Sequence, residues 1–303
     1  MSLRDTEDLY RGLRSYAFAI AYRMLGSVSE AEDVVQEAFV RLGGARGDIE
    51  NPKAYLATIT TRLAIDALRA ARRQRETYCG PWLPEPLVNP DPAELTDVAG
   101  TAESLTMAFL VLLETLSPTE RAVFLLRDVF DYDYPEIAQI LGKNEAACRQ
   151  LASRARRRIE SGKPRFEVSR DEQDKLAQRF FAACRDGDMA GLIQLLAGDA
   201  AFYGDGGIKG TGVPRPIYGR DNVVKLLLGL FRHGRRLGIR IRTAVVNAQP
   251  GALCLDAEGR LINVMCLDIV GGAVHAVRSV VNPDKLGHLG TLSPIGRRAR
   301  QGG

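Results

Sequence analysis

Six polar residues near the middle of the chain carry side chains that suit the reading of DNA bases. A guanidinium group can form paired hydrogen bonds with guanine, and a carboxamide can do the same with adenine. The residues are spaced to share one face of a helix and the turn before it. They are Lys143, Asn144, Arg149, Gln150, Ser153 and Arg154. The pattern predicts contact with the major groove of DNA.

Two short helices with a tight turn between them must position these residues. Pro135 stands where the first turn of a helix tolerates proline, and Gly142 ends that helix. Asn144 can cap the second helix, whose inward stripe would be Ala147 or Cys148, Leu151, Ala155 and Ile159. The segment 131–160 therefore predicts a helix-turn-helix. A helical hairpin with a solvated, arginine-rich end is the alternative.

Length and composition narrow the class of protein. A chain of 303 residues suggests two or three domains, and 46% hydrophobic with 26% charged residues is ordinary for a globular protein. No apolar run could cross a membrane, and the N-terminal residues lack a signal-peptide core, so we expect a cytoplasmic protein. The net charge is only +4, so DNA binding must depend on local clusters.

The five cysteines are scattered and include no Cys-x-x-Cys pair. Their distribution predicts reduced, mostly buried thiols rather than disulfides. No cluster of residues suggests a metal site, and we expect no cofactor.

Three amphipathic helices are predicted before residue 76. The first spans 6–25, the second starts at Ser29 with a Ser29–Glu32 capping box and runs to Leu42, and the third extends from 53 to about 74. The second helix exposes an acidic and amide face formed by Asp33, Gln36 and Glu37. The third has a cationic outer face and end, with Arg62, Arg69, Arg72, Arg73 and Arg75, and Tyr55 lies nearby.

A proline-rich segment follows, which predicts a semi-rigid linker. It contains Trp82, the only tryptophan of the chain, between prolines. Because an exposed tryptophan between prolines is poorly soluble, we expect Trp82 to dock on a neighbouring domain. Helical periodicity resumes at Ser104, and four helices are expected from there to Glu160.

The last third of the chain predicts an α+β domain with helices on one face of a curved sheet. We expect a helix over 171–186, a strand in the sequence AAFYGDGG, a helix in DNVVKLLLGLFRHG, and strands over 239–247, 261–270 and 273–281. Turns such as AQPG, AEG and VGGA are expected between these strands, which would then form an antiparallel meander. The tail after residue 286 has little to bury and is expected to be disordered.

The helical part resembles the extracytoplasmic-function sigma factors of bacterial RNA polymerase. The resemblance rests on AEDVVQEAFVRL, on NPKAYLATITTRLAIDALRAARR and on the helix-turn-helix. It implies a multidomain fold with two all-α domains before the α+β domain. The expected boundaries are 1–76 for region 2, 77–103 for the linker, 104–162 for region 4, 169–286 for the α+β domain and 287–303 for the tail.

The resemblance also implies partners. Asp33, Gln36 and Glu37 would bind the β′ clamp helices of core polymerase, and the β flap is a second expected contact. The third helix and the loop 47–51 would recognise the minus-ten element of promoter DNA, with Arg62, Arg69, Arg72 and Arg73 on the backbone and Tyr55 nearby. The six residues of the helix-turn-helix would read the minus-thirty-five element. A monomer is expected.

The α+β domain resembles SnoaL-like domains, which are cone-shaped relatives of nuclear transport factor folds. Three motifs point to one subgroup of sigma factors: Trp82-Leu83-Pro84-Glu85-Pro86, Asp205-Gly206-Gly207 with Lys209, and Asn282-Pro283-Asp284-Lys285-Leu286. Ile208 departs from the subgroup, which usually has a third glycine there. The resemblance implies regulation in cis by this domain.

Two other classes compete with a regulated sigma factor. An enzyme could use His275 with Asp268 or Asp256, or Tyr203 with Asp205, but an isolated histidine in an apolar strand pattern is more often structural. We therefore expect no enzyme. A DNA-binding regulator that senses a small molecule and never joins polymerase is the second class. A basic run, which we expect to be a solvated edge, comprises Arg232, Arg235, Arg236, Arg240 and Arg242.

Overall fold

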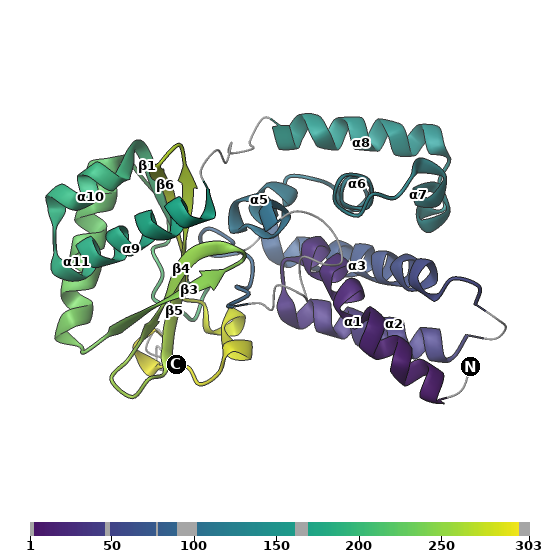
Figure 1. Ribbon diagram of the computed structural model, residues 1–303, viewed down its shortest axis with the longest axis horizontal. Helices are drawn as coiled ribbons and strands as arrows, with labels where there is room; N and C mark the ends of the chain where they lie inside the picture. The colour runs from purple at the N-terminus through teal and green to yellow at the C-terminus, as the bar shows by residue number, and fades with distance from the viewer. Residues whose placement is uncertain (1–2, 46–48, 77, 90–101, 161–168, 297–303) are drawn as a thin grey trace. The chain divides into compact units, whose positions relative to one another are not determined.

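The computed structural model describes residues 3–45, 49–76, 78–89, 102–160 and 169–296, with only the backbone described for 3–9 and 72–76. These residues form two compact units (Figure 1). The helical unit comprises 1–77, 91–105 and 109–163, and the α+β unit comprises 78–90, 106–108 and 164–303. The expected order of two helical regions followed by an α+β region is confirmed.

Three helices open the helical unit: α1 (Leu3–Leu25), α2 (Val28–Gly43) and α3 (Pro52–Glu76). They pack through buried apolar side chains such as Ile20, Val35 and Leu56. The expected start of α2 at Ser29 is wrong. Gly26 takes a left-handed conformation at φ 66°, which turns the chain early, and the side chain of Ser27 caps the helix by accepting from the Glu30 amide.

The second helical region contains η1 (Ala102–Leu105), α5 (Met107–Leu113), α6 (Pro118–Phe124), the π-helical turn η2 (Leu125–Val129), α7 (Tyr134–Leu141) and α8 (Glu145–Glu160). The helix-turn-helix prediction is confirmed for α7 and α8. Gly142 ends α7 in a left-handed conformation, and Asn144 Oδ1 accepts from the Ala147 amide at 2.8 Å to cap α8. A shared apolar core that includes Val123, Ile137 and Cys148 holds the two helices together.

The α+β unit has three helices, α9 (Arg170–Asp186), α10 (Met189–Leu195) and α11 (Arg220–Arg236). Its strands are β1 (Leu196–Asp205), β2 (Ile217–Tyr218), β3 (Arg240–Val246), β4 (Gln249–Leu255), β5 (Leu261–Val270) and β6 (Ala273–Val280). The sheet order is β2-β1-β6-β5-β4-β3. The strands expected at 239–247, 261–270 and 273–281 are found as β3, β5 and β6 in an antiparallel meander, but β4 is an additional strand between β3 and β5. Strand β1 pairs parallel with β6.

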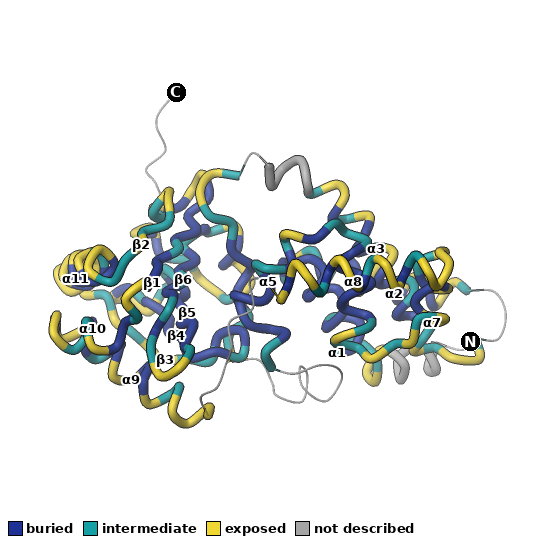
Figure 2. The backbone as a smooth tube through the Cα atoms, turned by 90° about the horizontal axis from the view of Figure 1, so that it is seen from above, coloured by how far each residue is buried: buried dark blue, intermediate teal, exposed yellow. Residues whose placement is uncertain are grey.

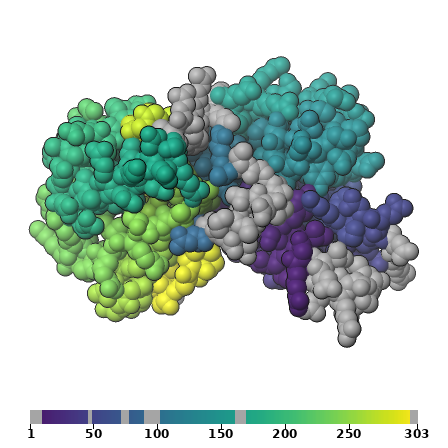
Figure 3. All heavy atoms as spheres, viewed as in Figure 1, coloured from purple at the N-terminus to yellow at the C-terminus, as the bar shows by residue number. Residues whose placement is uncertain are grey.

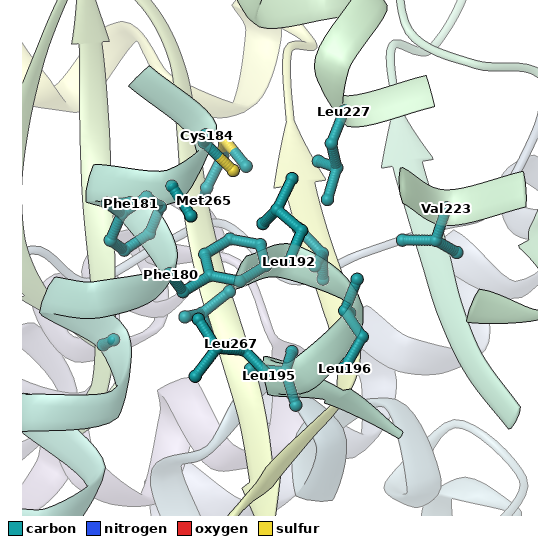
Figure 4. Close-up of a cluster of buried hydrophobic side chains, with 14 of the residues drawn as sticks. Phe180, Phe181, Cys184, Leu192, Leu195, Leu196, Val223, Leu227, Met265 and Leu267 are labelled. Atoms are coloured by element: carbon teal, nitrogen blue, oxygen red, sulfur yellow. The ribbon is translucent and has the colours of Figure 1, made fainter. Parts of the chain in front are cut away.

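Side chains from all three helices converge on one face of this sheet. Figure 4 shows Phe180 and Phe181 of α9, Leu192 of α10 and Leu227 of α11 gathered in one apolar cluster with Met265 of β5. The central strands are accordingly dark blue in Figure 2, the colour of buried residues. The layered α+β arrangement follows from this shared apolar core.

Two parts of the α+β unit differ from expectation. The sequence Gln249-Pro250-Gly251 resembles a turn, but strand β4 begins there. The turn itself lies at Asn247 and Ala248, which have φ angles of 51° and 58°. Residues 287–296 are ordered against the sheet, and the amide of Ser293 donates to the Leu261 carbonyl at 2.8 Å. Residues 297–303 lie outside the described part of the chain.

No helix within the described residues is long and apolar enough to span a membrane. The same residues contain no group of three or more histidine, cysteine, aspartate or glutamate side chains placed to hold a metal ion.

Thiol reactivity tests this packing. Cys79 is exposed, whereas the other four cysteines are buried, and burial raises the pKa of the Cys254 thiol to about 12. Because the thiolate is the reactive form, we expect one of the five thiols of the native chain to react rapidly with a chromogenic disulfide reagent, and all five after unfolding. Cys79→Ser should remove the rapid phase. Rapid reaction of a second thiol in the native chain would contradict the fold.

Candidate functional site

The outer face of α8 presents the residues expected to read DNA. All six are exposed: Lys143, Asn144, Arg149, Gln150, Ser153 and Arg154. The Arg149 guanidinium lies 4.6 Å from the Tyr134 ring centroid and bonds Glu145 at 2.8 Å, so the face is partly preorganised. Asn144 uses its side-chain oxygen to cap α8, which leaves its amide nitrogen for other partners.

The expected DNA contacts of α3 lie along one helix. Tyr55 is exposed, and Arg69 forms a surface ion pair with Asp66 at 3.2 Å. Such exposed pairs are weak, so Arg69 can exchange Asp66 for a phosphate. Arg72 and Arg73 belong to α3, but their side chains lie outside the described residues.

Arg62 of α3 has a different environment from its neighbours. Its Nε donates to the Ile140 carbonyl at 2.7 Å and its Nη2 to the Gln139 carbonyl at 3.1 Å. These two carbonyls belong to the last turn of α7, where a helix leaves acceptors unpaired and carries partial negative charge. Arg62 therefore ties the third helix to the first helix of the helix-turn-helix.

The contact between the two helical regions also involves aromatic side chains and buried cationic side chains. The Tyr16 ring packs edge-on against Phe130 with centroids 5.9 Å apart, and the Tyr16 and Tyr132 hydroxyls form a hydrogen bond. Arg23 is fully buried, and burial lowers the pKa of its guanidinium to about 10. Its carbonyl accepts from Arg121 Nε at 3.1 Å. The two helical regions are thus packed directly on each other.

The loop expected to hold a flipped base is only partly described, because 46–48 lie outside the described residues. Asn51 caps α3, with its Oδ1 accepting from the Ala54 amide at 3.0 Å. A cavity of about 240 Å³ lies beside it and is lined by Tyr16, Lys53 and Phe130. This cavity sits in the contact between the helical regions.

The acidic face of α2 is open. Asp33, Gln36 and Glu37 are all exposed, and Glu37 bonds Arg41 at 2.7 Å in an exposed pair of the kind that contributes little to stability. All three side chains can therefore meet a partner.

A buried carboxylate organises the linker segment in the α+β unit. Asp205, at the end of β1, is 0% exposed. Its oxygens accept from the Tyr78 hydroxyl, from the Leu83 amide at 2.8 Å and from Lys285 Nζ at 2.7 Å. Burial and the neighbouring carboxylate raise the pKa of Tyr78, which keeps its hydroxyl protonated as a donor. A charge-assisted cluster of this kind holds the segment firmly.

Lys285 binds the same segment through three further contacts. Its ammonium donates to the Leu83 carbonyl and lies 4.3 Å from the Trp82 ring centroid and 4.8 Å from that of Tyr78. Cation–π contacts of a buried ammonium are stronger than exposed ones. Trp82 therefore docks within the α+β unit.

Asn282 completes the cluster and explains the glycines after Asp205. Its Nδ2 donates to the Tyr78 hydroxyl at 2.7 Å, and a Cβ added to Gly207 would lie 2.6 Å from that nitrogen. A Cβ added to Gly206 would lie 2.4 Å from the Gly212 amide nitrogen. Ile208, in contrast, is 77% exposed, so a side chain is tolerated where the subgroup has a third glycine.

The remaining residues of the three motifs surround this cluster. Lys209 pairs with Asp284 at 2.8 Å on the surface, and Pro283 opens the turn η3 (Pro283–Lys285). Four others are buried: Pro84, Glu85, Pro86 and Leu286. The structure thus brings together in one unit the motifs that the sequence singled out.

Beyond the cluster, the linker pairs with the open edge of the sheet. Leu87 and Asn247 exchange hydrogen bonds of 2.8 and 3.0 Å, and the Asn89 amide donates to the Val245 carbonyl at 2.8 Å. Val88 and Val246 form an antiparallel bridge between them. Edge pairing of this kind is how sheets bind extended peptides. Figure 3 shows blue spheres of the linker bordering yellow spheres of the C-terminal residues.

Sequence reasoning missed four of these linker contacts. They involve Tyr78, Asn89, Asn247 and His288, whose Nε2 lies 2.9 Å from the Pro86 carbonyl oxygen. Tyr78 could have been suspected as an aromatic beside the Trp82 motif. No pattern marks the other three, because their partners are backbone groups brought close only by folding.

The candidate catalytic pairs are not assembled. His275 lies 3.4 Å from Asp199 on the surface rather than beside Asp268 or Asp256. Asp268 pairs with Arg278 at 2.8 Å. Burial opposes ionisation of Asp256, but hydrogen bonds from Ser293 and Arg260 prevail and lower its pKa to about 2.

Tyr203 does not join Asp205 either. Its ring centroid lies 4.8 Å from the Arg278 guanidinium. The carboxylate of Asp205 is instead engaged by the linker and Lys285. Neither expected pair therefore has the geometry of a general acid and base.

Comparison with known proteins gives consistent matches. Residues 9–74 match the family model for sigma-70 region 2, and residues 106–159 match that for sigma-70 region 4. The ECF RNA polymerase sigma factor SigJ of Mycobacterium tuberculosis is 36% identical over 301 residues, which are 96% of this chain and 95% of the relative. The probable ECF RNA polymerase sigma factor SigI of the same species is 32% identical, covering 97% and 96%.

A solved structure agrees with these matches. The crystal structure of the Mycobacterium tuberculosis extracytoplasmic function sigma factor SigJ superposes with a TM-score of 0.73 at 34% identity. The match covers 94% of this chain and 98% of that chain. The similarity includes the α+β unit as well as the helical unit.

The emission of Trp82 tests the linker site. Asp205→Asn removes the charge that Lys285 and the linker share, so we expect the segment to loosen and Trp82 emission to shift to longer wavelength with stronger acrylamide quenching. Lys209→Ala breaks only the exposed Lys209–Asp284 pair and should leave the emission unchanged. Identical spectra for Asp205→Asn and the unsubstituted chain, with circular dichroism showing both folded, would refute the anchoring role.

Proposed function

We propose a function for this chain from the premise that it belongs to the extracytoplasmic-function family of RNA polymerase sigma factors. It recruits core RNA polymerase to specific promoters and initiates transcription there, and its own α+β unit regulates this activity in cis. It acts in the cytoplasm as a monomer. The attachment of the linker to the α+β unit through Asp205 and Lys285 is the observation that carries the regulatory part.

Core binding is assigned to the acidic face of α2. The exposure of Asp33, Gln36 and Glu37 supports a contact with the β′ clamp helices. A row of carboxylates and an amide suits a basic partner surface, where complementary charge speeds association. The second helical region would add a contact with the β flap.

Promoter reading is divided between two helices. The exposed face of α8 suits the major groove of the minus-thirty-five element, where Arg149 and Gln150 can read base edges. The basic face of α3 suits the minus-ten element, where Tyr55 can stack on an unpaired base. Arg62, Arg69, Arg72 and Arg73 would follow the phosphates.

The packing of the helical unit is incompatible with reading both elements at once. The elements are separated by about 25 base pairs, or roughly 85 Å at about 3.4 Å per base pair. Arg62, however, holds α3 within hydrogen-bonding distance of α7. The contact must open before the two helical regions reach their sites, and opening also frees Arg62 for DNA.

The α+β unit can oppose that opening because it holds the segment that connects the two helical regions. Residues 78–89 are bound to it along their length, from Tyr78 at Asp205 to Asn89 at Val245. A tether makes such contacts effective, since the local concentration of the segment is in the millimolar range for short connections. Release of the linker is therefore the regulated step.

Charge reversal tests the contact with polymerase. Asp33→Lys should weaken binding to bacterial core polymerase about tenfold, because a lysine would meet a basic partner surface. Asp186→Lys, an equal charge change at an exposed position of the α+β unit, is the matched control. Binding is measured by fluorescence anisotropy of labelled chain. Equal affinities for the two variants would remove Asp33 from the interface, and no core binding by the unsubstituted chain would favour the sensing regulator.

Run-off transcription tests the restraint. On a promoter selected with the polymerase complex, we expect Asp205→Asn to transcribe at least about fivefold more than the unsubstituted chain, since it weakens the hold on the linker. Lys209→Ala should match the unsubstituted chain. Unchanged or lower activity for Asp205→Asn, with its core affinity intact, would contradict restraint by the linker site.

A further inference from the structure

A cavity of about 700 Å³ lies between α11 and the sheet of the α+β unit. Its walls are mostly apolar and include Phe202, Phe231, Ile241, Ile262 and Met265. Small-molecule sites in proteins have volumes of about 300–1,000 Å³ and similar walls. A void of this size costs packing energy, and its walls offer water few partners, so it suits an apolar ligand.

One end of the cavity is cationic. Three of its lining residues are arginines, Arg185, Arg235 and Arg240, and all three are exposed. Among the described residues that line the cavity there is no aspartate or glutamate. Like charges gathered beside an apolar cavity repel one another, and an anionic group would relieve that repulsion.

Helix ends explain only part of this charge. Arg185 lies in the last turn of α9 and Arg235 in the last turn of α11, where arginines complement the helix dipole. The Arg235 guanidinium lies against Gly187, which brings the two helix ends together. Arg240 opens β3 and has no helix end to complement. Its Nη2 donates to the Ala257 carbonyl at 3.0 Å, which holds the guanidinium in place and leaves its remaining N–H groups for a ligand.

A polar pair lies on the sheet wall of the cavity. Asn263 of β5 donates from Nδ2 to Ser279 Oγ of β6 at 2.7 Å. The Ser279 hydroxyl proton and Asn263 Oδ1 can then serve one polar group of a ligand, although the neighbouring walls are apolar. The cavity thus combines an apolar body, a cationic end and one interior polar pair.

We propose that this cavity binds an amphipathic carboxylate, with its hydrocarbon body against Phe202 and Met265 and its carboxylate at Arg235 and Arg240. Guanidinium groups bind carboxylates through paired, charge-assisted hydrogen bonds, which fits this choice of anion. The assignment concerns binding alone and holds whether or not the linker restrains transcription.

Isothermal titration of the full chain with dodecanoate, below its micelle concentration, tests the proposal. We expect saturable binding with one ligand per chain and at least about tenfold weaker binding of dodecanol, which lacks the charge. Acetate, which lacks the body, should not bind. The double variant Arg235→Ala/Arg240→Ala should lose about tenfold in dodecanoate affinity.

The double variant Arg236→Ala/Arg242→Ala is the matched control, because it removes equal charge from the same helix and strand at positions outside the cavity lining. It should bind dodecanoate like the unsubstituted chain. Absence of saturable dodecanoate binding would overturn the proposal. Equal binding of dodecanol, or equal losses in the two double variants, would overturn the carboxylate assignment.

Discussion

The buried carboxylate of Asp205 attaches the linker to the α+β unit through hydrogen bonds and an ion pair. An ion taken out of water is costly unless its partners are complete, and Asp205 finds them in Tyr78, the Leu83 amide and Lys285. These partners come from both ends of the α+β unit's sequence. The carboxylate therefore joins the two ends of the α+β unit and also holds the linker. The linker cannot leave without exposing a charged cluster.

In the helical unit, one arginine side chain likewise connects two parts of the chain. Arg62 satisfies the last carbonyls of α7, although a guanidinium on this face of α3 is also suited to phosphate. If Arg62 also contacts DNA, as we propose, the closed and DNA-bound forms are mutually exclusive. The cavity of the α+β unit lies beside the linker site, because its wall includes Gly212 and Val281, next to the Gly206 and Asn282 of that site.

Sequence reasoning succeeded where one local signal decided the structure. Pro135, Gly142 and Asn144 define the helix-turn-helix by backbone and capping rules that need no tertiary context. Sequence reasoning missed β4, because its Gln-Pro-Gly start resembles a turn. In the structure this start pairs with β3, and glycine is needed at position 251 because a side chain there would meet Met265. The contact of Arg62 with α7 and the role of Asn247 could not be predicted either, since both depend on carbonyls and amides that only folding brings near.

A reversible lock on the linker tests the central claim most directly. Val88 and Val246 are opposed without direct hydrogen bonds between them, a pairing that suits a disulfide. In an Asp205→Asn, Cys79→Ser background, Val88→Cys/Val246→Cys should transcribe freely when reduced. Oxidation should suppress run-off transcription at least about tenfold, and reductant should restore it. Full activity of the oxidised chain, with the disulfide verified by mass spectrometry, would contradict restraint through the linker.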